Sequence, residues 1–353
     1  SAFPSSATVP TNLYNGNFKP EITTSFETGL EARLLKNRLN LDATIYQTLT
    51  KNQIISVPLD ITTGYSSGVL NSGEVRNRGV ELTLTGKIFD AKKFKWSSTL
   101  TFSRNWNKVM ELADGIDGQQ EIGSGGNATL LAKVGGTTTA IYGYGFVRSP
   151  EGEIVYDNAG LPAYPDEIQY IGDASPDWKA GLYNSFNFGP VTLNVMLDGQ
   201  YGGIIYSQTH HKLTQQGKLR STFEGREEGF IVGDGVVLNE DGTYSPNTTE
   251  AITPDWYNRY YRRANVESNS FDASFLKLRE VSLQYAFPKR LLGNSGITAL
   301  NISVFGRNLA TVSDFPIYDP ETAALNGDTI LPGIEMGQMP SPATYGFNLK
   351  VNL

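Results

Sequence analysis

The side chains best suited to chemistry lie in a stretch near residues 204–270 that is rich in aromatic and basic residues. Aromatic faces stack on sugar rings, and a guanidinium can fork onto a carboxylate. These residue types suggest a role in substrate binding for some of the residues. The alternative is that they pack the loop on itself. The candidates are His210, His211, Trp256, Tyr257, Arg259 and Tyr260.

Metal binding and catalysis have weaker support. Adjacent residues on a strand point to opposite faces, so His210 and His211 are not expected to share a metal. The run Asp114-Gly115-Ile116-Asp117-Gly118 has carboxylates beside glycines, as calcium loops do, but its spacing fits a turn better than an EF-hand. Cysteine is absent, and no nucleophile, base and orienting residue form a pattern. We therefore expect no enzyme and no cofactor, with a loop calcium as the alternative.

Composition narrows the class of protein further. The net charge of −7 argues against a nucleic-acid partner, because binding to phosphates needs a basic surface. No stretch of eighteen apolar residues is present, so a transmembrane helix is not expected. Mean hydropathy is −0.28, which suits a chain in which only alternate residues meet lipid.

The elements that must position these residues are strands with an apolar residue at every second position. In 22–34 the even positions include Phe26 and Leu30, whereas Glu27 and Glu31 are odd, and a period of two puts the sets on opposite faces. Strands of soluble domains are mostly about five or six residues, whereas a membrane-crossing strand needs about nine to eleven. Nine stretches follow the pattern: 22–34, 39–50, 80–88, 94–103, 178–188, 190–203, 271–287, 297–309 and 345–353.

The connections between these stretches are alternately short and long. The short ones are 36–38, 90–93, 189–190 and 288–296, and the long ones are approximately 52–74, 108–177, 204–270 and 310–342. Outer-membrane barrels have short periplasmic turns and long extracellular loops. The sequence therefore predicts an all-β fold, a transmembrane antiparallel β-barrel with its C-terminus in the periplasm. A large soluble β-protein is the alternative.

The barrel is expected to be incomplete. An open sheet in lipid leaves unpaired backbone groups at both edges, and bacterial single-chain barrels have an even number of strands. Nine is odd, and residues 1–4 do not read as the start of a signal peptide. Residues 1–353 are thus expected to be the C-terminal part of one β-barrel domain within a longer precursor.

Seven ordered segments resemble the C-terminal region of SusC/RagA-type TonB-linked outer-membrane transporters. The first, FKPEITTSFE, is similar to their LKPE-x-TTSFE-x-G segment, and the second, GEVRNRGVEL, is similar to their strand entry G-x-(I/V)-x-N-x-G-(V/I)-E. The resemblance covers nearly the whole chain. The segments are Phe18–Glu27, Gly73–Leu82, Ile141–Tyr144, Gly172–Trp178, Asp272–Leu283, Gly306–Leu309 and Tyr318–Glu321.

This resemblance implies a 22-stranded barrel in a Gram-negative outer membrane, of which the chain supplies the last nine strands. It also implies an N-terminal plug and a TonB box, both outside this chain, and energy from the TonB–ExbB–ExbD complex. A SusD-like surface lipoprotein is the implied lid, so contact with that lid is a further alternative for the six candidate residues. The implied substrates are oligosaccharides or, as in the RagA branch, oligopeptides.

The last strand resembles the signal by which barrel-assembly machinery recognises its clients. An exposed strand edge can be captured by β-augmentation, which gives this signal a physical basis. Leu353 replaces the aromatic residue that is typical at the end, and ordinary lipid contact is the alternative role. The residues of the signal are Thr344, Gly346, Leu349, Val351 and Leu353.

Two other functions remain open at this stage. A passive porin would need neither plug nor partner. A surface barrel could instead use its loops as an adhesin or enzyme. The segment matches favour active import over both.

Overall fold

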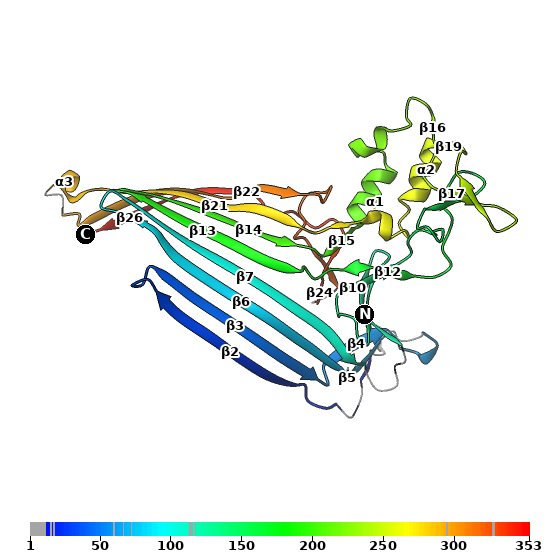
Figure 1. Ribbon diagram of the computed structural model, residues 1–353, viewed down its shortest axis with the longest axis horizontal. Coiled ribbons are helices and arrows are strands. Elements are labelled where there is room, and N and C mark those ends of the chain that lie inside the picture. Colours follow the sequence, from blue (N-terminus) through cyan, green and yellow to red (C-terminus); the bar gives the residue numbers. More distant parts are fainter. Residues whose placement is uncertain are drawn as a thin grey trace, which may run out of the picture.

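Nine long strands form one antiparallel sheet in the computed structural model, which describes residues 12–14, 16, 18–58, 61–65, 67–71, 73–112, 116, 118–293, 296–326 and 329–353 (Figure 1). Each strand pairs with the next of the nine along the chain, so the expected antiparallel all-β fold is confirmed. In sheet order the strands are β2 (Ile22–Leu34), β3 (Leu39–Lys51), β6 (Glu74–Asp90), β7 (Phe94–Glu111), β13 (Trp178–Phe188), β14 (Val191–Tyr201), β21 (Phe275–Ala286), β22 (Ala299–Ser313) and β26 (Thr344–Asn352).

The sheet is open. Within the described residues, β2 pairs only with β3 and β26 pairs only with β22. These two strands therefore present free backbone groups along the two edges. In lipid, unpaired N–H and C=O groups cost several kcal/mol each, so both edges need further partners.

One face of the sheet, here called the apolar face, is lined by aliphatic and aromatic side chains. Cross-strand pairing fixes which residues share it, because directly paired residues point the same way. Leu30 is 60% exposed and Phe347 76%, so this face is bare. A wide uncovered apolar surface suits contact with lipid. One row crosses eight strands: Ala32, Leu41, Leu84, Leu100, Leu182, Leu197, Leu278 and Ala310.

Aromatic rings border the apolar face at both ends of the strands. Near the short turns, the ring centroids of Phe94 and Phe188 lie 4.7 Å apart. At the opposite end, the centroids of Trp178 and Tyr201 lie 5.7 Å apart. Barrels carry such aromatic girdles where the hydrocarbon layer meets the headgroups.

The four short connections lie at one end of the sheet together with the C-terminus (Figure 1). Between β2 and β3, Leu35, Lys36 and Asn37 have positive φ angles of 51°, 57° and 64°. Between β13 and β14, Phe188 pairs with Val191, which leaves a two-residue turn. Its first residue, Gly189, has φ 61°, a conformation that glycine adopts without strain.

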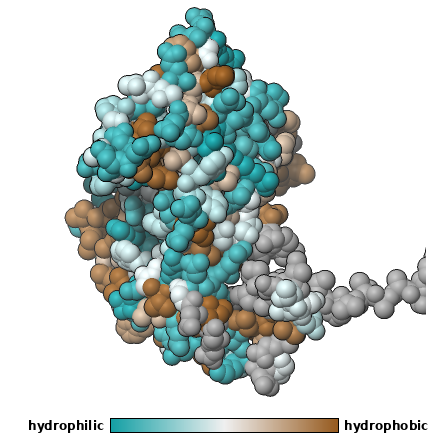
Figure 2. Space-filling model, turned by 90° about the vertical axis from the view of Figure 1, so that its right-hand side faces the viewer, coloured by the Kyte–Doolittle hydropathy of each residue, from teal (hydrophilic) through white to brown (hydrophobic). Residues whose placement is uncertain are grey.

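The four long connections, 52–73, 112–177, 202–274 and 314–343, lie at the other end of the sheet, which is mostly hydrophilic in Figure 2.

No helix among the described residues is long and apolar enough to span a membrane. The remaining elements are β1 (Asn12–Tyr14), β4 (Ile54–Pro58), η1 (Ile61–Thr63), β5 (Ser67–Asn71), β8 (Gln119–Gly125), β9 (Ala128–Lys133), β10 (Ala140–Gly143), β11 (Val155–Tyr156), β12 (Gln169–Asp173), β15 (Ile204–Ser207), α1 (Gln208–Gln215), η2 (Arg220–Phe223), β16 (Phe230–Ile231), β17 (Val236–Leu238), β18 (Tyr244–Pro246), β19 (Ala251–Ile252), α2 (Thr253–Tyr260), η3 (Glu267–Asn269), β20 (Ser270–Asp272), α3 (Lys289–Leu292, in a short connection), β23 (Ala324–Asn326), β24 (Thr329–Leu331) and β25 (Ile334–Glu335).

Three of the long connections share a hydrophobic core. Leu130, Ile141, Tyr206 and Ile334 come from three different connections and are almost fully buried together. A second cluster packs Leu112 and Ala132 against Val109 of β7, on the face of the sheet opposite the apolar one. The loops thus form a packed cap that leans over this second face, here called the polar face.

Candidate functional site

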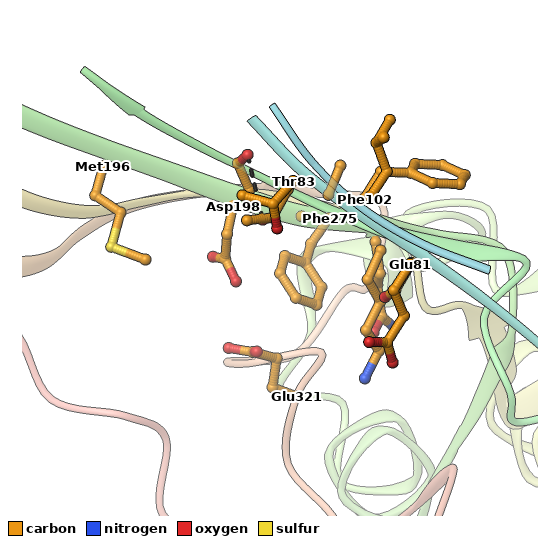
Figure 3. A pocket seen from close by; sticks show the side chains of 15 residues that line it. Glu81, Thr83, Phe102, Met196, Asp198, Phe275 and Glu321 are labelled. Atoms are coloured by element: carbon orange, nitrogen blue, oxygen red, sulfur yellow. Dashed lines mark hydrogen bonds between the residues drawn. The ribbon is translucent and has the colours of Figure 1, made fainter. Parts of the chain in front are cut away.

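A pocket of about 380 Å³ lies on the polar face beneath the cap. Strands β6, β7, β13, β14 and β21 form its wall, and one side chain comes from the connection 314–343. In Figure 3, Asp198, Phe275 and Glu321 point into the space, whereas Phe102 points away to the apolar face. The alternation along each strand therefore separates the pocket from the lipid-facing surface.

Two basic residues of β21 hold the connection 314–343 against this wall. Lys277 Nζ lies 2.6 Å from Asp319 Oδ1 and also contacts the Glu321 carboxylate. Arg279 bridges Glu321 and Asp198, donating from its Nη2 to Asp198 Oδ2 at 3.1 Å. Lys277 is only 3% exposed. These contacts are charge-assisted hydrogen bonds, which are stronger than neutral ones, so the cluster fixes the connection in place.

A β-bulge aims both cations toward the polar face. Leu278 and Val281 both lie on the apolar face, so strict alternation fails between them, and the register shifts at Arg279. Opposite the bulge, Asn308 on β22 has φ 52°. A bulge inserts an extra residue and re-aims the side chains that follow. Without it, Lys277 would share the lipid-facing side with Val281.

The two carboxylates of the connection titrate below their usual range. Burial by itself would raise the pKa of Asp319, but hydrogen bonds from Lys277 and from the N–H groups of Glu321 and Ser341 outweigh it and lower that pKa. Burial is similarly outweighed at Glu321, where Arg279 and Lys277 lower the pKa of the carboxyl. Both groups therefore stay ionised at neutral pH, and the cluster keeps its charges.

The remaining lining of the pocket can bind a polar solute. Glu81 and Lys179 offer opposite charges, and Thr83, Thr101 and Ser103 offer hydroxyl groups. Carboxylates and hydroxyls accept hydrogen bonds from sugar hydroxyls, and Lys179 can pair with a peptide carboxylate. Among the residues that the structure describes, no three His, Cys, Asp or Glu side chains are placed to hold a metal ion.

The two histidines that the sequence singled out lie in the cap, away from this pocket. They sit on α1, whose first turn is capped by Ser207, and not on a strand as the sequence interpretation assumed. His210 Nδ1 lies 3.0 Å from Asn269 Oδ1, and His211 Nδ1 donates to the Tyr261 carbonyl at 2.6 Å. Both rings are buried and bond to different partners, so packing accounts for their positions.

The aromatic cluster on α2 is also packed within the cap. The Trp256 and Tyr260 rings stack with centroids 4.5 Å apart, and the Tyr257 hydroxyl donates to the Ser221 carbonyl at 2.9 Å. The Arg259 guanidinium lies 3.8 Å from the Tyr164 ring centroid. Contact between substrate and any of these residues stays a prediction.

Lowering the pH should destabilise the cap because the buried ring of His210 becomes protonated. Burial lowers the pKa of its ring, so the folded state holds it neutral at pH values where the unfolded chain, with a pKa near 6.5, binds a proton. The stabilisation is present above about pH 6.5 and is lost as the pH falls through the lower folded value. After correction for the pH dependence of the intrinsic exchange rate, the amides of α1 are expected to be less protected at pH 5 than at pH 7.5. The variant His210→Gln should show a smaller difference in protection, and equal protection at the two pH values in the unmodified protein would contradict the expectation.

The residues of the expected assembly signal lie on β26, the last strand of the sheet. Leu349 and Val351 share the apolar face with their β22 partners Ile302 and Leu300, whereas Gly346 pairs with Phe305 on the polar face. A Cβ on Gly346 would approach Phe305 Cζ to 2.5 Å, so the glycine leaves room for that ring. Thr344 opens the strand and Leu353 follows its end. Recognition by assembly machinery stays a prediction.

Asp114, Gly115 and Asp117 lie outside the described residues, and the calcium alternative therefore stays a prediction.

Sequence reasoning missed the pocket beneath the cap. One signal was available: Lys277 and Arg279 interrupt the apolar series at the odd positions of their strand, and acidic residues recur in the segment Tyr318–Glu321. Their pairing depends on a long-range approach that spacing along the chain does not reveal.

Comparison with known proteins places the chain in a family. Residues 2–222 match the family model described as TonB dependent receptor-like, beta-barrel. TonB-dependent receptor P3 of Formosa agariphila is 27% identical over 371 residues, which cover 97% of this chain and 35% of that protein. TonB-dependent receptor SusC of Bacteroides thetaiotaomicron is 23% identical over 363 residues, covering 96% and 32%. The chain thus spans about a third of the length of these relatives.

Among solved structures, the RagAB peptide transporter superposes with a TM-score of 0.69 at 18% identity, covering 94% of this chain and 35% of that one. At this level of identity the likeness supports the fold alone.

Proposed function

The chain belongs to the TonB-dependent receptor β-barrel family, and from this premise we propose that it forms part of the wall of an active importer in the outer membrane of a Gram-negative bacterium. The apolar face meets lipid, the cap faces the outside of the cell and the C-terminus lies in the periplasm. The observation that carries this proposal is the two-faced sheet, with every long connection at one end and the polar pocket below it.

The open edges define what else the importer needs. We propose that preceding strands of the same protein pair with β2 and close the barrel against β26, because unpaired edges are costly in lipid. A plug and a TonB box upstream would couple transport to the TonB–ExbB–ExbD complex. The barrel-assembly machinery would insert the protein through its last strand. The importer would need no resident cofactor.

The partner on the outer side is proposed to be a SusD-like lipoprotein seated over the cap. The hydrophilic surface of the cap supports this placement (Figure 2). The substrate is proposed to be an oligosaccharide or an oligopeptide, held during passage by the pocket on the polar face. Glu81 and Lys179 would bind its hydroxyl, amine or carboxylate groups.

Uptake assays test this function. Cells that express the intact protein should accumulate a labelled oligosaccharide or peptide, and an uncoupler of the proton gradient should abolish accumulation. Uptake that survives the uncoupler would instead indicate a passive porin. Glu81→Gln should raise the substrate concentration for half-maximal uptake about tenfold, the equivalent of one charge-assisted hydrogen bond. Glu27→Gln, on the same face but outside the pocket, serves as the matched control.

A further inference from the structure

A groove of about 610 Å³ opens on the apolar face at the end that carries the cap. Strands β2, β3, β6 and β7 form it. Two of its side chains, Phe26 and Ile45, continue the apolar surface of the sheet, whereas the others include basic residues. Cross-strand pairs of Arg76 with Lys108 and of Arg78 with Trp106 place all four on this same face.

The groove is locally positive although the whole chain carries a net charge of −7. Arg76, Arg78 and Lys108 line it, and no carboxylate does among the residues described around it. Arg78 Nε donates to Gln47 Oε1 at 2.5 Å, which leaves its terminal nitrogens available. The nearby Lys51 already pairs with Glu74 at 2.9 Å. Among the residues that the structure describes, none pairs ionically with Arg76, Arg78 or Lys108, so three cations line one groove without an anionic partner there.

The groove lies at the level along the membrane normal where the surface of the membrane is expected. Trp106 follows Trp96 on β7 by ten residues, which is roughly 33 Å along a strand and roughly 25 Å along the membrane normal at the usual tilt. The apolar band of such barrels is about 25 Å tall, and Trp96 belongs to the aromatic rings near the short turns. Trp106 and its basic neighbours therefore lie at the level of the lipid headgroups on the cap side.

We propose that this groove binds the phosphorylated headgroup of a lipid of the outer leaflet, with one acyl chain along Phe26 and Ile45. Arg76, Arg78 and Lys108 neutralise the phosphate, and Trp106 lies against the headgroup region. A basic cluster beside the membrane attracts anionic lipid by about 1 kcal/mol per cation, or roughly fivefold in affinity. The apolar floor favours a lipid over a free phosphate. The inference rests on the proposed function because that proposal sets the cap outside the cell.

Lipid binding to the intact, detergent-purified protein tests the inference by native mass spectrometry. The probes are a diphosphorylated glucosamine-disaccharide lipid, the same lipid without phosphates, and inorganic phosphate. The double variant Arg76→Gln, Lys108→Gln removes two cations and should weaken binding of the phosphorylated lipid by about 25-fold. The matched control is Lys92→Gln, Lys93→Gln, in the short turn between β6 and β7 at the opposite end of the sheet.

Loss of the phosphorylated lipid in the double variant alone would support the inference. Equal binding by both double variants, or by the lipid without phosphates, would overturn it. Inorganic phosphate that binds alone and displaces the lipid would also overturn it in favour of a free anion. Labelling of the variant Glu240→Cys on intact cells, at an exposed position of the cap, separates this result from the proposed function. If the cap is labelled but the double variant binds the lipid as well as its control does, only the lipid site is rejected. If the cap stays unlabelled, the orientation on which both proposals depend is rejected.

Discussion

Lys277→Ala is expected to destabilise the protein by about 3–5 kcal/mol, the usual effect of removing one partner from a buried ion pair. Lys277 contacts both Asp319 and Glu321, and its loss leaves the Asp319 carboxylate buried beside no other cation that contacts it among the described residues. The connection 314–343 should then detach from β21. Denaturant unfolding in lipid vesicles measures the stability, and limited proteolysis reports the freed connection.

Arg307→Ala is the matched control for this prediction. Arg307 pairs with Glu280 at 2.8 Å on the neighbouring strand, but its side chain is 58% exposed. Exposed pairs contribute about 0–1 kcal/mol, so this variant should remain close to the unmodified protein. Adding Asp319→Asn to Lys277→Ala should recover part of the loss. If Lys277→Ala costs no more than Arg307→Ala, the buried charge cluster does not anchor the connection.

Leu100→Arg is expected to cost about 2–4 kcal/mol in the folded, membrane-inserted state, the range for a cation near the midplane on the lipid face of a barrel. Leu100 lies midway between Trp96 and Arg104 on β7 and pairs with leucines on both sides. At this position the introduced arginine places its charge in the hydrocarbon layer of the membrane. Reversible unfolding from phosphatidylcholine vesicles measures the effect.

The adjacent Thr101→Arg supplies the control, because Thr101 lies on the polar face of the same strand. A cation there meets water in the barrel interior and should cost much less. Equal losses from the two variants would mean that the faces are wrongly assigned.

The strands were predictable because alternation is a local property. The expected 178–188 coincides with β13, and the expected 22–34 coincides with β2. Where the predicted end of a strand was wrong, interactions other than the alternation of apolar residues determine the observed end. The expected strand at 271–287 begins at Phe275, because Phe271 and Asp272 belong to β20 and pair with β15 in the cap. Strand β7 runs on to Glu111, although Arg104 and Lys108 interrupt its apolar alternation.

The site was much less predictable than the fold. The pocket depends on side chains from five strands and one distant connection, and on a bulge at Arg279 that reverses which face Lys277 occupies. Counting every second residue along a strand does not detect such a shift in register. Residue type alone made His210 and His211 candidates for substrate contact, with packing of the loop as the alternative. Their burial on α1 follows from contacts that only the packed cap provides.

The assignment of the two faces of the sheet is the central claim, and spin labels at Leu30 and Glu31 test it most directly. Leu30 lies on the apolar face and its neighbour Glu31 on the other, and both are exposed in the structure. In the intact protein in lipid vesicles, the label at position 30 should collide mainly with oxygen dissolved in the hydrocarbon, and the label at position 31 mainly with an aqueous nickel chelate. A water-accessible label at 30 together with a lipid-accessible label at 31 would contradict the account.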